Sequence, residues 1–180
     1  MTERVTERRK EPEPQELIFE YMQEYYRVRR EQGEKGTIVL KGKDIPWEQN
    51  RQGLIRFYTH PQNWKKLAVP GWSLFVHHIK KQGGRHTHQG GLGLFVLDGK
   101  GYTVVDGTRF DWEKDDLILL PMKPGGCEHQ HFNLSDKPSS WLAFIFNPFW
   151  DASGNLKVQS ETSPDWKGPN APPPVVPHVS

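Results

Sequence analysis

Two short histidine-containing segments of this sequence could hold a metal ion. His86 and His88 form an H-x-H pair, and His129 lies in a second segment, GCEHQHFN. Because side chains alternate along a β-strand, both imidazoles of an H-x-H pair point to one face. A third imidazole from a distant strand would complete a set of nitrogen ligands that suits Zn, Cu, Fe or Ni. We therefore predict a metal site made of His86, His88 and His129, with coordination positions left open for water, O2 or a chelating substrate.

Polar residues beside these histidines are candidates for catalytic or binding roles. His131 shares the predicted strand face of His129, so it could be a fourth ligand, support a ligand, transfer a proton or simply pack. Arg85 and Arg109 could each bind a substrate carboxylate through two hydrogen bonds, although most arginines are solvated. Gln89 could hydrogen-bond to a ligand, and surface placement is its alternative. From these we predict His131, Arg85 and Gln89 as catalytic residues.

Other residues near the two segments have simpler predicted roles. His77 and His78 are adjacent in a predicted strand, so one of them faces inward and could reach a pocket. Cys127 is expected to pack as a small apolar side chain, with thiolate ligation as the less favoured alternative. Asn133 is expected to bond to the backbone, and Gln130 either supports a ligand or lies at the surface.

The segments that would position these residues are short strands. From Thr37 onward, β-branched and aromatic runs alternate with turn residues; the runs are TIVL, LIRFY, WSLFVHHI, LGLFVLDG, GYTVVDG, LILLP and WLAFIF. Many short strands at this spacing predict an antiparallel barrel or sandwich. Asp106-Gly107 predicts a tight hairpin turn. Trp72, Phe95, Phe144 and Phe146 are expected in the core rather than as a platform for a substrate.

The two ends of the chain differ from this central part. Residues 1–36 are predicted to form a mobile arm and a helix over 15–32, which Gly33 and Gly36 end. The apolar stripe of this helix either packs on its own domain or crosses a subunit interface. Residues 37–150 are the predicted barrel, and residues 151–180 are a proline-rich tail that lies over the barrel or extends freely.

The composition limits the classes of function. The chain has 180 residues, a formal net charge of +2 and a mean hydropathy of −0.77. Its small charge and scattered basic residues argue against nucleic-acid binding. The single cysteine excludes an internal disulfide and favours a reducing compartment. We find neither a secretory signal nor an apolar run long enough to span a bilayer, so a soluble cytoplasmic protein is expected.

The two histidine segments resemble the paired motifs of the cupin superfamily. The first motif, G-x5-H-x-H-x3,4-E-x6-G, is similar to RHTHQGGLGLFVLDG through His86, His88 and Gly99. The second motif, G-x5-P-x-G-x2-H-x3-N, is similar to PGGCEHQHFN through Pro124, Gly126, His129 and Asn133. The resemblance covers roughly residues 70–150. It implies an all-β fold, a single cupin barrel of the double-stranded β-helix or jelly-roll type, with the N-terminal helical segment outside it.

One departure from the family pattern bears on the chemistry. The glutamate expected after the H-x-H pair is replaced by Leu92 or Gly93, depending on the spacing. The sequence looks most similar to gentisate-type dioxygenases, which are built on three histidines. That likeness implies an Fe(II)-dependent enzyme that uses O2 to cleave a C–C bond of a small hydroxylated aromatic, carboxylate or enolate substrate.

Two other functions fit the same residues. Mn, Ni or Zn in place of iron could act as a Lewis acid in a non-oxidative isomerase, lyase or decarboxylase. Alternatively, the barrel could bind a small ligand or a metal without turnover. Exposed strand edges and the aromatic helix favour a homodimer in each case.

Overall fold

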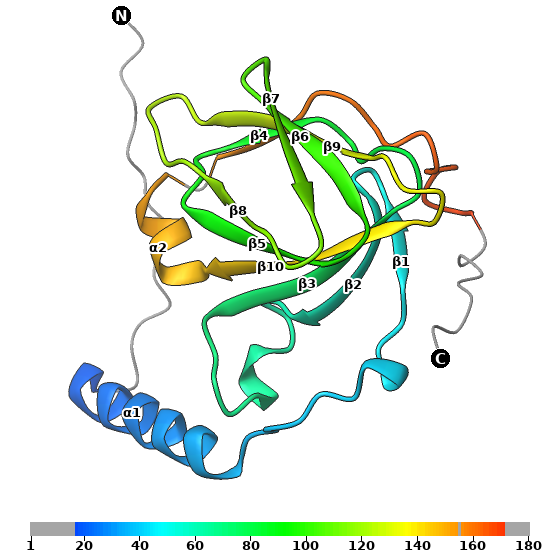
Figure 1. The fold of residues 1–180 in the computed structure, drawn as a ribbon. Helices are drawn as coiled ribbons and strands as arrows, with labels where there is room; N and C mark the ends of the chain where they lie inside the picture. Colours follow the sequence, from blue (N-terminus) through cyan, green and yellow to red (C-terminus); the bar gives the residue numbers. More distant parts are fainter. Residues whose placement is uncertain (1–16, 155, 172–180) are drawn as a thin grey trace, which may run out of the picture.

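Two antiparallel β-sheets form a barrel in the computed structural model, which describes residues 17–154 and 156–171 (Figure 1). The strands are β1 (Glu48–Asn50), β2 (Gly53–Thr59), β3 (Trp72–Ile79), β4 (His86–His88), β5 (Leu92–Asp98), β6 (Lys100–Val105), β7 (Thr108–Glu113), β8 (Leu117–Leu120), β9 (Cys127–Asn133), β10 (Ser139–Phe146) and β11 (Lys157–Gln159). The helices are α1 (Ile18–Lys35), α2 (Asn147–Ala152) and two short 3-10 helices, Gly42–Asp44 and Trp64–Lys66. The predicted all-β fold with an N-terminal helix is confirmed.

Each sheet combines strands that are distant in the sequence. The six-stranded sheet has the order β1-β2-β3-β10-β5-β8, and the five-stranded sheet has the order β11-β4-β9-β6-β7. Consecutive strands β4, β5 and β6 therefore alternate between the two sheets, which is the arrangement expected for a jelly-roll barrel. The three histidines predicted as ligands all lie on two neighbouring strands of the five-stranded sheet, β4 and β9.

The Asp106-Gly107 turn joins β6 and β7 as the sequence predicts. The two strands pair out to Val105 and Thr108, so the loop between them has two residues. Asp106 has φ 48° and Gly107 has φ 84°. Two successive positive φ values define a type I′ turn, which matches the twist of a hairpin and favours glycine at the second position.

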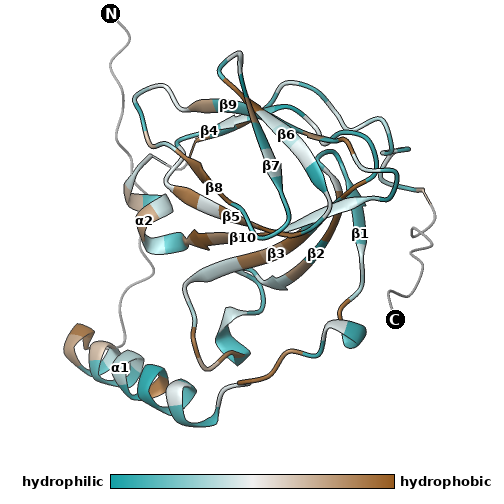
Figure 2. Ribbon diagram, in the orientation of Figure 1, coloured by the Kyte–Doolittle hydropathy of each residue, from teal (hydrophilic) through white to brown (hydrophobic). Residues whose placement is uncertain are grey.

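Buried apolar side chains fill the space between the sheets. The core cluster consists of Ile79, Leu92, Leu94, Val96, Trp112, Leu120, Cys127, Trp141 and Ala143. Hydrophobic residues also continue along β10 and β8 (Figure 2), and several of their side chains are exposed. Phe95 on β5 and Phe144 and Phe146 on β10 are at least 36% exposed, so their assignment to the core was wrong. They sit at the strand positions that alternate with core residues, and an apolar side chain on either face gives the same sequence signal.

The N-terminal helix lies beside the barrel and does not bury its apolar stripe in it. No residue of α1 is buried, and Ile18, Phe19, Tyr21 and Tyr25 are each at least half exposed. The stripe therefore does not pack on the described part of its own domain, which corrects one of the two alternatives. The helix is attached through its last turn, where the Gln32 side chain donates a hydrogen bond of 2.8 Å to the Leu67 carbonyl.

Two further sequence predictions differ from the structure. The TIVL run forms no strand: Thr37 makes one bridge to Leu67, and Ile38 is exposed. Gly33 does not end α1, which continues to Lys35 and is capped by Gly36, whose backbone N–H donates a hydrogen bond to the Gln32 carbonyl. The predicted arm, the helix start at Gln15 and residues 172–180 lie outside the described residues. The boundaries at 37 and 150 stay predictions.

Candidate metal centre

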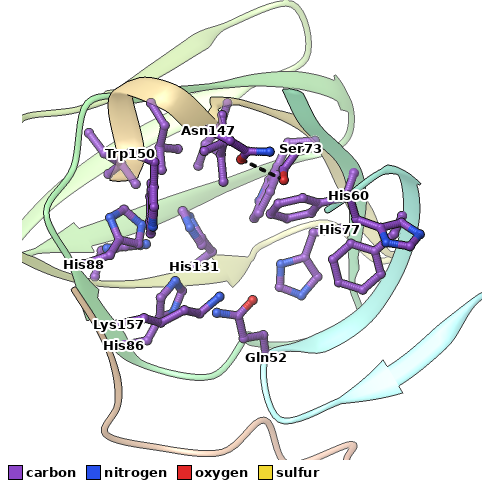
Figure 3. A pocket seen from close by; sticks show the side chains of 18 of the residues that line it. Gln52, His60, Ser73, His77, His86, His88, His131, Asn147, Trp150 and Lys157 are labelled. Atoms are coloured by element: carbon purple, nitrogen blue, oxygen red, sulfur yellow. Dashed lines mark hydrogen bonds between the residues drawn. The ribbon is translucent and has the colours of Figure 1, made fainter. Parts of the chain in front are cut away.

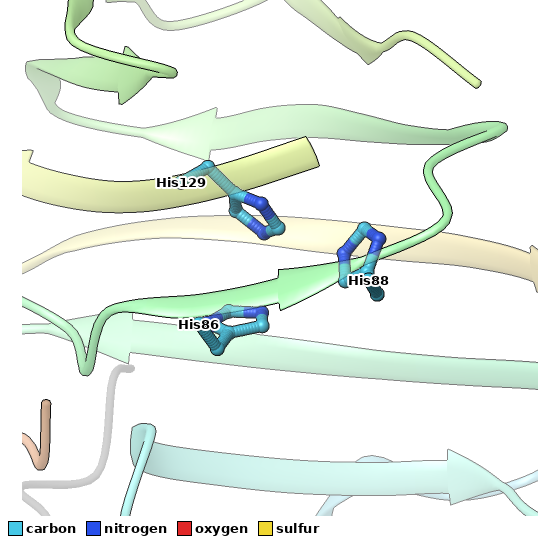
Figure 4. A group of neighbouring side chains, drawn as sticks. All are labelled: His86, His88 and His129. Carbon is cyan, nitrogen blue, oxygen red and sulfur yellow. The ribbon is translucent and has the colours of Figure 1, made fainter. Parts of the chain in front are cut away.

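The pairing of β4 with β9 brings the three histidines together. His86 lies directly opposite His129 in this antiparallel pair, and His88 follows two residues along β4. All three side chains therefore point to the inner face of the sheet, as Figure 4 shows. One ligand atom from each ring can be chosen such that all lie within 4.8 Å of one another. Among the described residues, this is the single group of histidine, cysteine and carboxylate side chains close enough to share a metal ion.

Burial keeps these imidazoles neutral. Desolvation lowers the pKa of His88 to about 3 and that of His129 to about 4. It also places the pKa of His86 well below its ordinary value, and the neighbouring His129 adds to the effect. A neutral imidazole offers the nitrogen lone pair that a metal ion needs. At neutral pH the three rings are therefore in the protonation state of metal ligands.

Backbone hydrogen bonds orient two of the rings for ligation. The Nδ1 atoms of His86 and His129 lie 3.2 Å and 3.0 Å from the carbonyl oxygens of Gly84 and Cys127. A carbonyl only accepts hydrogen bonds, so both rings carry their proton on Nδ1 and leave the Nε2 lone pair free. This arrangement, a ligand ring held by a backbone carbonyl, is common at metal sites.

His88 makes the opposite kind of hydrogen bond. Its Nδ1 accepts the backbone N–H of Gly90 at 3.0 Å. A metal bound through Nδ1 would compete with the Gly90 N–H for the lone pair of that nitrogen. If the metal bound through Nε2 instead, the ring proton would move to Nδ1 and would then face the Gly90 N–H. In either case, metal binding through His88 exchanges the Gly90 hydrogen bond for the metal bond. The three histidines fit a metal ion once His88 gives up its hydrogen bond with the Gly90 N–H.

A carboxylate ligand is missing at the position where cupin motifs have glutamate. Leu92 occupies that part of β5, is buried and lines the cavity beside the histidines. No carboxylate belongs to the group of potential ligands among the described residues. An apolar side chain can neither coordinate nor offset the charge of a divalent ion. The ligand set is thus three neutral imidazoles, which leaves the full charge of the ion available to an anionic ligand.

The histidines line a cavity of about 380 Å³ inside the barrel (Figure 3). Its remaining walls are mainly apolar and aromatic, with Phe57, Phe75, Leu94, Trp141, Ile145 and Trp150 among the lining residues. Ser73 and Asn147 face each other on one side and are joined by a hydrogen bond of 3.0 Å. Pockets of about 300–1,000 Å³ with apolar walls and few polar groups are typical of small-molecule sites.

His131 lines the same cavity but is not part of the potential ligand group. It is 1% exposed, and its Nδ1 lies 2.7 Å from the hydroxyl of Thr103. That hydroxyl also accepts the Trp112 Nε1–H at 3.0 Å, so its own proton is available for Nδ1 of His131. Burial places the pKa of His131 well below its ordinary value. Burial thus keeps the His131 ring neutral, and when Thr103 donates to Nδ1 the ring carries its proton on Nε2.

The structure places the other predicted site residues outside the cavity lining. Arg85 forms an ion pair with Glu161, and the Gln89 amide donates a hydrogen bond of 2.9 Å to the Trp150 carbonyl. Arg109 is exposed, pairs with Asp111 and stacks on Tyr102. Gln89 is connected to the site through Trp150. It bonds to the Trp150 carbonyl, and the Trp150 ring packs against His88 with 5.0 Å between ring centroids.

The remaining neighbours behave as structural residues. Cys127 belongs to the core cluster, and burial raises the pKa of its thiol to about 11, so it is a poor metal ligand at neutral pH. Asn133 donates hydrogen bonds to the carbonyls of Lys80 and Lys137, as expected. His77 is the inward-facing member of its pair: it lines the cavity, and burial lowers its pKa to about 3.

Sequence reasoning missed Lys157, which also lines the cavity. It lies on β11, in the segment predicted as a proline-rich tail, and β11 adds a strand to the edge of β4. Burial lowers the pKa of Lys157. The sequence signal was weak because LKVQS is too short and polar for a strand pattern, and only its pairing with β4 turns the lysine inward.

The barrel and its histidine cluster define a class of protein. The family model for the cupin domain matches residues 75–145, from β3 to β10. This match covers both histidine segments, and it agrees with the two-sheet barrel. The part of the barrel formed by residues 75–145 is therefore similar to the cupin domain.

More specific likenesses come from individual proteins. Gentisate 1,2-dioxygenase of a Streptomyces species is 29% identical over 111 residues, which cover 61% of this chain and 26% of that enzyme. The matched part is thus about a quarter of that relative. The oxalate decarboxylase of Lactobacillus farciminis has a similar fold, with a TM-score of 0.54 at 14% identity over 69% of this chain and 36% of that one. A salicylate 1,2-dioxygenase from Pseudaminobacter salicylatoxidans gives a TM-score of 0.45 at 23% identity, over 82% of this chain and 39% of that one.

Proposed function

We propose that this protein is an Fe(II)-dependent cupin dioxygenase that cleaves a C–C bond of a small hydroxylated aromatic or related carboxylate or enolate compound with O2. The observation that carries the proposal is the set of three neutral imidazoles, without a carboxylate, at the wall of an aromatic cavity. The 29% identity to a gentisate 1,2-dioxygenase supports the same class of reaction. His86, His88 and His129 would hold the metal.

The rest of the cavity would bind and orient the substrate. When bound, Fe(II) would supply the redox chemistry that combines O2 with the substrate. The aromatic walls, including Phe75 and Trp141, would pack against the body of the substrate and exclude bulk water. Water exclusion strengthens the electrostatic interactions of an anionic substrate in the cavity. We assign no contact with substrate to Arg85 or Gln89, because neither residue lines the cavity.

Oxygen uptake tests this proposal directly. Iron-loaded protein is expected to consume O2 in the presence of at least one member of a panel of hydroxybenzoates, dihydroxybenzoates and β-diketones, and none in their absence. The measurement is an oxygen electrode combined with mass spectrometry of the product, in which both atoms of ¹⁸O2 should appear. Turnover that persists under strict anaerobiosis would favour the metal-dependent isomerase, lyase or decarboxylase alternative.

His131 is proposed to donate a hydrogen bond from Nε2 to a substrate oxygen. His131→Leu removes this donor while leaving the three ligands intact, so the oxygen-uptake kcat/KM is expected to fall about 10- to 100-fold, the cost of losing one well-placed hydrogen bond. His131→Gln keeps an N–H donor and should recover part of this loss. Metal content should stay at the wild-type value in both variants, and loss of the metal from His131→Leu would instead make His131 a ligand.

Two coarser predictions accompany the enzyme proposal. No helix in the described part of the chain has the length and apolar character needed to cross a membrane. A cytoplasmic location and the absence of nucleic-acid partners remain predictions from composition. A homodimer is proposed because α1 and the outer face of β10 both expose aromatic side chains, such as Tyr25 and Phe144, that water solvates poorly.

A further inference from the structure

The strand β11 carries one side chain into the metal-centre cavity from outside the cupin motifs. Lys157 is the direct partner of His88 in the antiparallel pairing of β11 with β4. Opposite residues in such a pair point to the same face of the sheet, with Cβ atoms about 4.5–5.5 Å apart. Because His88 points inward, Lys157 does too, and Figure 3 shows its side chain beside His86 in the cavity.

Lys157 differs from the other cationic residues around the site in having no anionic partner. Among the described residues, no ion pair or hydrogen bond of its amine is found, whereas Arg85 next to the histidines pairs with Glu161. Lys157 is also the sole lysine or arginine among the described residues that line the cavity. The residue is exposed and also lines the cavity, so it lies where the cavity opens to solvent.

One acidic residue, Asp151 on α2, lines the same cavity. It is exposed and forms no ion pair with Lys157 within the described structure, so it does not neutralise the amine. A bound anion would be repelled by Asp151 and attracted by Lys157 and by a divalent ion at the histidines. These charges favour an anionic group on the β4–β11 side of the cavity, between Lys157 and the histidine cluster.

We propose that Lys157 binds the carboxylate of the substrate and thereby selects organic anions that chelate the metal through a neighbouring oxygen. This inference rests on the proposed function, since it names the substrate class for the same site. The carboxylate would accept charge-assisted hydrogen bonds from the Lys157 amine, and a hydroxyl or keto oxygen beside it would face the metal ligands. The aromatic walls would then hold the carbon skeleton.

Binding of matched pairs of probes tests the inference without turnover. Salicylate and salicylamide, and oxalate and oxamide, differ by replacement of carboxylate groups with neutral amides. Calorimetric titration is done anaerobically with iron-loaded protein and, separately, with the metal-free protein. The wild-type protein is expected to bind at least one carboxylate about tenfold or more tightly than its amide, and this preference should weaken with added salt.

Variants of β11 assign the preference to one side chain. Lys157→Met keeps the length of the side chain and removes its charge, so carboxylate affinity should fall about tenfold or more while amide affinity changes less than about threefold. Lys157→Arg should retain most of the preference. Val158→Thr is the matched control, because Val158 lies on the same strand, is 52% exposed and faces away from the cavity.

The possible results separate this inference from the proposed function. Equal losses for carboxylate and amide in Lys157→Met, or a wild-type protein with no preference for any carboxylate, would overturn the role of Lys157. A charge preference that disappears in Lys157→Met would support it even if iron-loaded protein consumed no oxygen. In that case the dioxygenase proposal would fail, and an anion-binding cupin with another activity would remain.

Discussion

Replacement of His129 by alanine is expected to abolish stable metal binding. The three potential ligand atoms lie within 4.8 Å of one another, and no carboxylate among the described residues completes the group. Two imidazoles on the three-residue strand β4 would remain, with no third protein ligand on the facing strand. Substitution of a residue that hydrogen-bonds to a metal ligand weakens metal affinity by about 10- to 100-fold. Removal of the ligand itself should therefore weaken the affinity by more than about 100-fold.

Metal content after gel filtration measures this effect. The wild-type protein should retain about one equivalent of iron or zinc, and His129→Ala should retain less than about a tenth of that. Metal should raise the melting temperature of the wild-type protein and leave that of the variant unchanged, because only the form that binds is stabilised. His60→Ala is the matched control: His60 also lines the cavity, but it is not in the ligand group. Wild-type metal content in His129→Ala would refute the assignment.

The metal-free protein is expected to unfold at mildly acidic pH, near pH 5. Burial lowers the pKa of His77 and His88 to about 3 and that of His129 to about 4, and those of His86 and His131 fall well below the ordinary value. In the unfolded chain each histidine takes up a proton near pH 6.5. The unfolded state therefore binds more protons than the folded state between about pH 6.5 and these lowered pKa values.

The sign of the effect follows from this difference in bound protons. The stability that the neutral histidines provide is fully present above about pH 6.5 and is lost as the pH falls toward 4 or 3. Each histidine destabilises the fold by up to about 1.4 kcal/mol per pH unit in this range. Together they reach several kcal/mol by pH 5, a large part of the roughly 5–15 kcal/mol that keeps a domain folded.

Circular dichroism between pH 7 and 4 gives the unfolding midpoint. Bound metal should move the midpoint to lower pH, because protons must first displace the metal from its ligands. Removing a buried histidine should also lower the pH at which the protein unfolds. His77→Gln, if it folds, should therefore have its unfolding midpoint at lower pH than the wild-type protein. A metal-free protein that keeps its near-UV signal at pH 4 would show that the buried rings do not resist protonation.

The ligand cluster could be predicted from sequence because local periodicity and one long-range pairing define it. The H-x-H spacing places His86 and His88 on one face of a strand whatever the strand pairs with. The second motif then supplies His129. The strands β3, β5, β6, β8 and β10 were visible as apolar runs for a similar reason, since their inner faces are buried.

The features that escaped prediction depend on contacts between distant segments. Arg85 is adjacent to His86, yet its partner Glu161 could not be foreseen, and this ion pair turns the guanidinium away from the cavity. Lys157 lies in a polar segment that becomes a strand through its pairing with β4. Phe144 and Ala143 are neighbours with similar apolar character, and only the fold decides that the alanine is buried and the phenylalanine exposed.

The attachment of β11 to β4 has a consequence for how such barrels diversify. The strand protects the open edge of β4, and it lies beyond the segment matched by the family model. Mutation or recombination in these few residues can therefore exchange a positive group at the cavity mouth for a neutral or negative one while the histidine motifs stay intact. Descendants of one ancestral barrel with identical motifs would then accept different compounds, and motif-based classification would group them together.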